Sequence, residues 1–163
     1  MSLSLPPTYV EGHNLLKDKR VIVTAAAGTG IGFSVAKRCL EEGASVLISD
    51  IHEGRLKDSA VRLEKETGVQ PATSLCNVTS QEDVDRLFVT ATEVFGETDV
   101  VINNAGLAVG KGAIDQGLID DWDRMVDTNV KGLLYVSKRI IPILKENGSG
   151  HIVNVASIAG KEV

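Results

Sequence analysis

Short runs of aliphatic and β-branched residues alternate with amphipathic helical segments along most of this chain, and no other feature constrains the fold as much. The expected strands cover residues 21–23, 45–49, 72–78, 99–102 and 151–155. Between them, apolar residues at helical spacing predict helices that begin near Ile31, Glu53, Val84 and Asp120. Strands that are apolar throughout and separated by helices form a parallel sheet that is covered on both faces. The predicted class is therefore α/β.

The connections between these strands favour one architecture. Crossovers between parallel strands are right-handed, which makes this a three-layer, doubly wound sheet with its ligand at the carboxyl ends of the strands. The length of 163 residues predicts a single domain covering residues 1–163. Residues 1–18 contain Pro6 and Pro7 and few periodic apolar positions, so we expect them to form an extended N-terminal arm.

The composition excludes several other classes. Lysine and arginine number 17 against 22 acidic residues, a net charge of −5, which argues against nucleic-acid binding. The longest unbroken apolar run covers only residues 133–136, so no membrane span is predicted, and residues 1–9 do not resemble a secretory signal. Cys39 and Cys76 fall in apolar segments and are expected to be buried free thiols. We therefore expect a cytoplasmic protein, and no metal site is predicted.

A glycine-rich turn at residues 24–32 lies between the first strand and the first helix. Glycines allow close approach to a pyrophosphate, and a helix N-terminus offers free N–H groups, although a tight turn without ligand explains such a segment equally well. Asp50 ends the second strand, where a carboxylate can accept hydrogen bonds from both ribose hydroxyls or simply cap the strand. It would repel a 2′-phosphate, and Ile51 and His52 supply no compensating cation. NAD is therefore expected in preference to NADP.

Two further strand ends add polar groups to the same edge of the sheet. Asn77 and Val78 close the third strand, and Asn104, Ala105 and Gly106 follow the fourth. Either segment alone is an ordinary turn, but four strand ends converging on one cleft fit an adenine and its ribose. The predicted cofactor-binding residues are Ala26, Gly28, Thr29, Gly30, Ile31, Gly32, Asp50, Ile51, Asn77, Val78, Asn104, Ala105 and Gly106.

These motifs and two later segments together resemble a known family. Residues 24–32, Asp50, residues 77–78, 103–106, 128–132 and 152–160 occur in the order and spacing typical of short-chain dehydrogenases/reductases. The resemblance covers the chain from Leu16 onward. It implies a Rossmann-type fold and hydride transfer between NAD(H) and a small-molecule secondary alcohol or ketone.

The resemblance also implies catalytic residues. The family's active site contains an asparagine, a serine, a tyrosine and a lysine, and Asn129 and Ser157 match the first two. Asn129 also lies on the apolar face expected for the long helix, where the alternative interpretation is a satisfied core amide.

The tyrosine and lysine of the family's Tyr-x-x-x-Lys motif have no match. Tyr9 is followed four positions later by His13, and Tyr135 by Arg139. Loss of general acid/base catalysis typically costs ~10²–10⁴-fold in rate. We therefore interpret the chain as the N-terminal portion of such an enzyme, lacking the C-terminal part of the sheet and catalytically incomplete by itself. A non-catalytic NAD-binding module remains an alternative, and an S-adenosylmethionine-dependent methyltransferase is a third interpretation.

The glycine-rich turn departs from the family pattern. An alanine follows Thr24 where the family has glycine, and the loop is one residue longer. Either Ala25 or Ala26 must take the first glycine's place, and Gly28 lies within the insertion.

Self-association is expected on two grounds. The fifth strand would have an open edge. The long helix has an apolar face of Trp122, Met125, Val126, Val130, Leu133 and Leu134, and further apolar residues at Tyr135, Ile140, Ile141 and Leu144 that need cover. Because the family pairs through this helix, a homo-oligomer (dimer or tetramer) is predicted.

Overall fold

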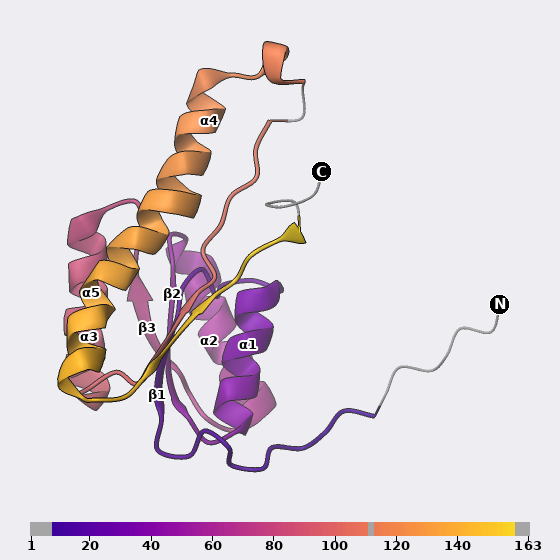
Figure 1. The fold of residues 1–163 in the computed structure, drawn as a ribbon. Coiled ribbons are helices and arrows are strands. Elements are labelled where there is room, and N and C mark those ends of the chain that lie inside the picture. Colours follow the sequence, from indigo (N-terminus) through magenta and orange to yellow (C-terminus); the bar gives the residue numbers. More distant parts are fainter. Residues whose placement is uncertain (1–7, 111–112, 159–163) are drawn as a thin grey trace.

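The computed structural model describes residues 8–110 and 113–158 and contains one five-stranded parallel sheet (Figure 1). The strand order is β3-β2-β1-β4-β5, and every neighbouring pair is parallel. The strands are β1 (Arg20–Val23), β2 (Ser45–Asp50), β3 (Ala72–Leu75), β4 (Val100–Asn103) and β5 (His151–Asn154). From β1 the chain adds β2 and β3 on one side of the sheet, and it then crosses back to add β4 and β5 on the other side of β1. This strand order is that of a doubly wound Rossmann-type fold, so the predicted fold class is confirmed.

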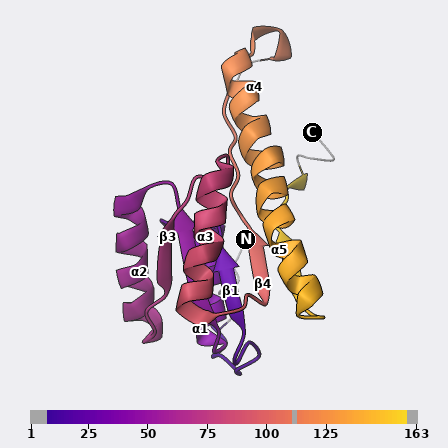
Figure 2. The same ribbon diagram turned by 90° about the vertical axis from the view of Figure 1, so that its left-hand side faces the viewer.

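Helices cover both faces of this sheet (Figures 1 and 2). Helices α1 (Ile31–Glu41) and α2 (Glu53–Thr67) pack on one face. Helices α3 (Gln81–Phe95) and α5 (Leu133–Glu146) pack on the other. A 3-10 turn (Ile114–Gln116) and helix α4 (Ile119–Val126) precede α5.

Alternation along the strands divides the core into two clusters. Val21 and Val23 of β1 pack with Phe33 of α1, whereas Ile22 packs with Leu87 of α3 on the opposite face. All five side chains are at most 3% exposed. Burying one such side chain contributes about 1.5–3 kcal/mol. Because helices cover both faces of the sheet, successive residues of a strand are all buried, which explains why the strands are apolar throughout.

The third strand is shorter than predicted. The pattern suggested residues 72–78, but β3 ends at Leu75, and Asn77 and Val78 therefore follow the strand instead of closing it. The reason is local hydrogen bonding: Oδ1 of Asn77 accepts the N–H of Thr79 at 3.1 Å and its hydroxyl at 2.9 Å. This turn directs the chain away from β2.

The next helix, α3, begins with a side-chain cap from Ser80. Oγ of Ser80 accepts the N–H of Asp83 at 3.3 Å. The Asp83 carboxylate accepts the N–H of Asn77 at 2.9 Å, and the N–H of Ser80 donates to the carbonyl of Asn77. Asp83 therefore ties the end of β3 to α3.

The long helix differs from the single regular helix that the sequence predicted. A π-helical segment, Asp127–Gly132, separates α4 from α5. Four members of the predicted apolar face are between 40% and 55% exposed, namely Trp122, Val126, Val130 and Leu134. In contrast, Ile140 is fully buried, and Tyr135 and Leu144 pack against the same core. The expectation that these three need cover from outside is wrong, because α3 and the sheet already cover them.

The N-terminal arm follows the C-terminal half of α1 over its described part, residues 8–18. The buried carboxylate of Glu42 accepts the N–H groups of His13 at 2.8 Å and Leu15 at 3.0 Å. Residues 1–7 lie outside the described residues. Across residues 8–110 and 113–158, no helix is long and apolar enough to cross a membrane.

Candidate active site

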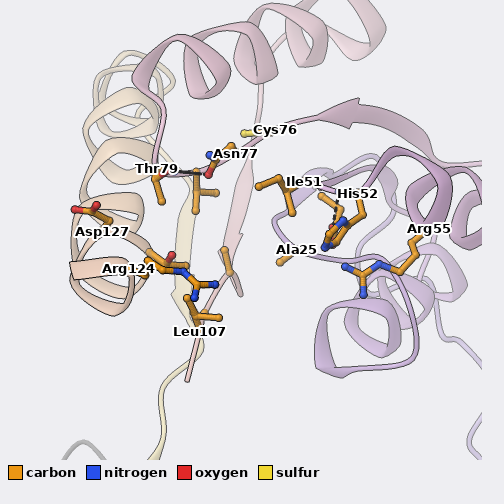
Figure 3. Close-up of a pocket in the computed structure, with 15 residues that line it drawn as sticks. Ala25, Ile51, His52, Arg55, Cys76, Asn77, Thr79, Leu107, Arg124 and Asp127 are labelled. Atoms are coloured by element: carbon orange, nitrogen blue, oxygen red, sulfur yellow. Dashed lines mark hydrogen bonds between the residues drawn. The ribbon is translucent and has the colours of Figure 1, made fainter. Parts of the chain in front are cut away.

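A cavity of about 550 Å³ opens at the carboxyl edge of the sheet (Figure 3). The segments that follow β1, β2, β3 and β4 all contribute to it, together with one face of α4 and the π-helical segment. Its lining residues are Ala25, Asp50, Ile51, His52, Arg55, Cys76, Asn77, Val78, Thr79, Ala105, Gly106, Leu107, Arg124, Asp127 and Thr128. Six of the predicted cofactor residues are therefore brought together: Asp50, Ile51, Asn77, Val78, Ala105 and Gly106.

Asp50 is a buried carboxylate at the wall of this cavity, with 8% of its surface exposed. Its Oδ1 accepts the N–H of His52 at 3.0 Å, and its Oδ2 accepts the N–H of Ala27 at 3.3 Å. Burial raises the pKa of this carboxyl above its ordinary value, against the opposing effects of the Ala27 amide and the positive charge of Arg55. A carboxylate can accept more bonds than these two, so it caps the turn and still has capacity for ribose hydroxyls.

Of the two alanines that could take the place of the family's first glycine, Ala25 is the one that lines the cavity. It has a φ of +50°, the left-handed conformation that glycine adopts freely and that costs other residues about 1–2 kcal/mol. Ala26 is fully buried, donates its N–H to the carbonyl of Ser49 at 2.9 Å, and does not line the cavity. The methyl group of Ala25 thus stands at the cavity wall in a strained turn.

The beginning of α1 presents backbone amides without competing groups. Its N-cap residue, Gly30, makes no side-chain capping bond, and the first turn contains no acidic residue. Thr29, Gly30 and Ile31 are exposed at this end. Gly32 is buried beneath them, where a Cβ would lie 2.5 Å from Nδ2 of Asn104. Free N–H groups and the helix dipole make this end suited to an anion.

Asn104 joins β1 to β4 beside the cavity. Its Nδ2 donates to the carbonyls of Thr24 and Ala25, both at 3.0 Å. Oγ1 of Thr24 in turn accepts the N–H groups of Asn104 at 3.0 Å and Ala105 at 3.1 Å. The side chain of Asn104 therefore positions the loop and does not itself line the cavity.

The two predicted catalytic residues lie outside the cavity lining. Asn129 is in the π-helical segment, where its Oδ1 accepts the N–H of Leu107 and its Nδ2 donates to the carbonyl of Leu107, both at 2.7 Å. The side chain is exposed, so the alternative of a core amide is wrong, but its hydrogen bonds hold a residue that does line the cavity. Ser157 is exposed and follows β5.

Sequence reasoning missed the two arginines of the cavity. Arg55 is in the first turn of α2, five positions after Asp50, so helix formation alone brings it back to the strand end. Arg124 lies on α4 one helical turn before Thr128, and its guanidinium points into the cavity (Figure 3). Spacing along a predicted helix was the available signal for both. In the described part of the chain, no cluster of His, Cys, Asp or Glu could hold a metal ion.

The architecture and the position of the cavity define a Rossmann-type protein, and comparison with known proteins identifies its family. The family model described as short chain dehydrogenase matches residues 19–163. A relative in Mycobacterium tuberculosis, (5R,7aS)-5-hydroxy-7a-methyl-1-oxo-2,3,5,6,7,7a-hexahydro-1H-indene-carboxyl-CoA reductase, is 40% identical over 98% of this chain and 61% of its own length.

Solved structures agree with this assignment. A short chain dehydrogenase from Mycobacterium smegmatis superimposes with a TM-score of 0.91 at 39% identity, over 98% of this chain and 67% of that one. NAD⁺-bound xylitol dehydrogenase gives a TM-score of 0.86 at 30% identity, over 91% of this chain and 56% of that one. The chain belongs to the short-chain dehydrogenase/reductase family of oxidoreductases. It spans about six tenths of the length of the curated relatives it matches.

Proposed function

We propose that this chain is the dinucleotide-binding portion of an NAD(H)-dependent oxidoreductase that interconverts a secondary alcohol and a ketone. The observation that carries the proposal is the placement of Asp50 and the uncapped amides of α1 on the same edge of the sheet. Asp50 is suited to the adenosine ribose, and the amides to the pyrophosphate. The structure named above, NAD⁺-bound xylitol dehydrogenase, holds a dinucleotide on the same fold.

The remaining cavity residues fit the same ligand. Ile51 and Val78 offer apolar side chains for the two faces of an adenine, and Asn77 offers an amide near its edge. NAD(H), when bound, supplies or accepts the hydride. Asn129 maintains the wall beside Gly106 through Leu107, and Ser157 is proposed to donate a hydrogen bond to the substrate oxygen.

Binding of NADH to this chain tests the proposal. We expect saturable binding by calorimetry, and about tenfold weaker binding in Asp50→Ala, because the ribose then loses a charged acceptor. Asp58→Ala removes an exposed aspartate of α2 that does not line the cavity, and it should bind as the original chain does. No binding at millimolar NADH would overturn the proposal.

Turnover is expected to be negligible, because the 163 residues contain no Tyr-x-x-x-Lys motif to move the substrate's proton. A second candidate function is a non-catalytic NAD-binding module, which the absence of this motif from the 163 residues favours. Joining the chain to a segment that contains this motif distinguishes the two: activity on secondary alcohols supports the enzyme, and binding without activity supports the module. The two buried thiols, Cys39 and Cys76, are consistent with a cytoplasmic protein, which we also propose.

A further inference from the structure

A buried serine of α2 holds the tip of the glycine-rich loop. Oγ of Ser59 accepts the N–H of Gly28 at 2.8 Å, and Ser59 is only 4% exposed. Its neighbours Leu56, Ala60 and Leu63 are fixed in the core formed with α1 and the sheet. The hydroxyl is therefore held in place by the packing of α2, and the loop is anchored to it.

The loop needs this anchor because little else holds its tip. Gly28 has a φ of +96°, and nothing lies within 4 Å of the position where its Cβ would be. The neighbouring N–H of Ala27 makes a longer bond of 3.3 Å to Asp50. Since this loop is one residue longer than is usual in the family, the extra residue must be packed somewhere, and Gly28 is packed through its amide.

This arrangement divides the amides of the loop into two sets. Those of Ala27 and Gly28 are used by the protein itself, on Asp50 and Ser59. The Ser34 hydroxyl donates to the carbonyl of Gly30, but no side chain caps the N–H groups at the beginning of α1, which leaves them available to a phosphate. The first set lies just before the second along the chain.

We propose that Ser59 is a positioning residue for cofactor binding: by accepting the Gly28 amide, it places the lengthened loop so that the free amides of α1 meet the pyrophosphate. This inference rests on the proposed function. Loss of the Ser59 hydroxyl should therefore weaken binding at the pyrophosphate subsite only. The adenosine subsite around Asp50, Ile51 and Val78 should stay intact.

Binding of adenosine, ADP-ribose and NADH to Ser59→Ala tests the proposal. We expect about tenfold weaker binding of ADP-ribose and NADH, the effect of one lost hydrogen bond, and unchanged binding of adenosine. Ser59→Thr retains the hydroxyl and should restore the affinity. Ser74→Ala is the matched control, since Ser74 of β3 is also buried but pairs in register with Ser49 of β2 and does not accept the Gly28 amide.

A measurement without any substitution gives an independent readout. In amide-resolved NMR, the Gly28 N–H should be protected from hydrogen exchange with and without ADP-ribose, while the Gly30, Ile31 and Gly32 resonances shift on binding. Equal losses for adenosine and ADP-ribose in Ser59→Ala, or a rapidly exchanging Gly28 amide, would overturn the inference. If the original chain binds no NADH, the proposed function fails instead; if it binds and Ser59→Ala binds equally, only this inference fails.

Discussion

Asp50 and Arg55 line the same cavity with opposite charges. Asp50 repels an additional phosphate, whereas Arg55 lines the same cavity and interacts favourably with the Asp50 carboxylate. The two residues after Asp50 supply no cation, but the first turn of α2 brings Arg55 to the same cavity. We propose that the balance between these two charges decides between NAD(H) and NADP(H).

Removing the acid should therefore reverse the preference. We expect the original chain to bind NADH more tightly than NADPH, and Asp50→Ser to gain roughly ten- to a hundredfold in affinity for NADPH relative to NADH, because Arg55 then attracts the 2′-phosphate without a competing carboxylate. Calorimetry with both nucleotides measures the ratio. The double variant Asp50→Ser/Arg55→Ala should lose the gain; retention of the gain would show that Arg55 does not reach the phosphate.

At the scale of elements, one ion pair joins the amino ends of two neighbouring strands. Asp99, just before β4, accepts Nε of Arg20 at 2.7 Å, Nη2 at 3.1 Å and the Arg20 backbone N–H at 2.9 Å. These bonds hold the pKa of Asp99 below its ordinary value of 3.8, against the opposing effect of burial. The strand order reverses between β1 and β4. This ion pair therefore stabilises the two strands whose following loops form the centre of the cavity wall.

The sign of the pH effect follows from that lowered pKa. An acid with a lower pKa in the folded state adds stability that is fully present above its unfolded value and is lost as the pH falls through the folded value. We expect Asp99→Asn to lower the free energy of unfolding by about 1–2 kcal/mol at pH 7, and the difference from the original chain to shrink below about pH 4. Urea denaturation at several pH values measures this.

The exposed pair Glu53–Lys57 provides the control for that series. Its charged atoms are 2.7 Å apart, but both side chains are well exposed to water. Glu53→Gln should leave the denaturation midpoint unchanged, as is common for surface pairs. A difference for Asp99→Asn that stays constant down to pH 2 would contradict an electrostatic origin.

At the scale of the whole molecule, the sequence predicts the layers well and the site in part. Uniformly apolar strands required helices on both faces, and right-handed crossovers predicted the doubly wound arrangement. Asp50 was identifiable because it ends a strand. Arg55 was identifiable in principle, because it follows Asp50 by five positions in the first turn of a predicted helix. Ser59 was not, because its role depends on how α2 lies against the loop, and periodicity along one helix carries no information about a neighbouring segment. The early end of β3 was missed for a local reason: Asn77 forms a side-chain turn that competes with the strand.

The segment from α4 to α5 leaves several apolar side chains uncovered. Trp122, Val126, Val130 and Leu134 are exposed and recur every four positions, so they form an apolar stripe along the helix. Val126 and Val130 are 48% and 51% exposed, and α4 projects beyond the sheet (Figure 1). An exposed apolar stripe favours burial against a second copy of the chain. We propose self-association through this stripe and expect light scattering at micromolar concentration to give a dimer or tetramer. Val126→Glu/Val130→Glu should give a monomer with an unchanged circular dichroism spectrum, because neither side chain belongs to the core. Val61→Glu on α2, where Val61 is an exposed valine (63%), should remain associated. An original chain that is monomeric at this concentration would show that exposure of the stripe does not drive pairing.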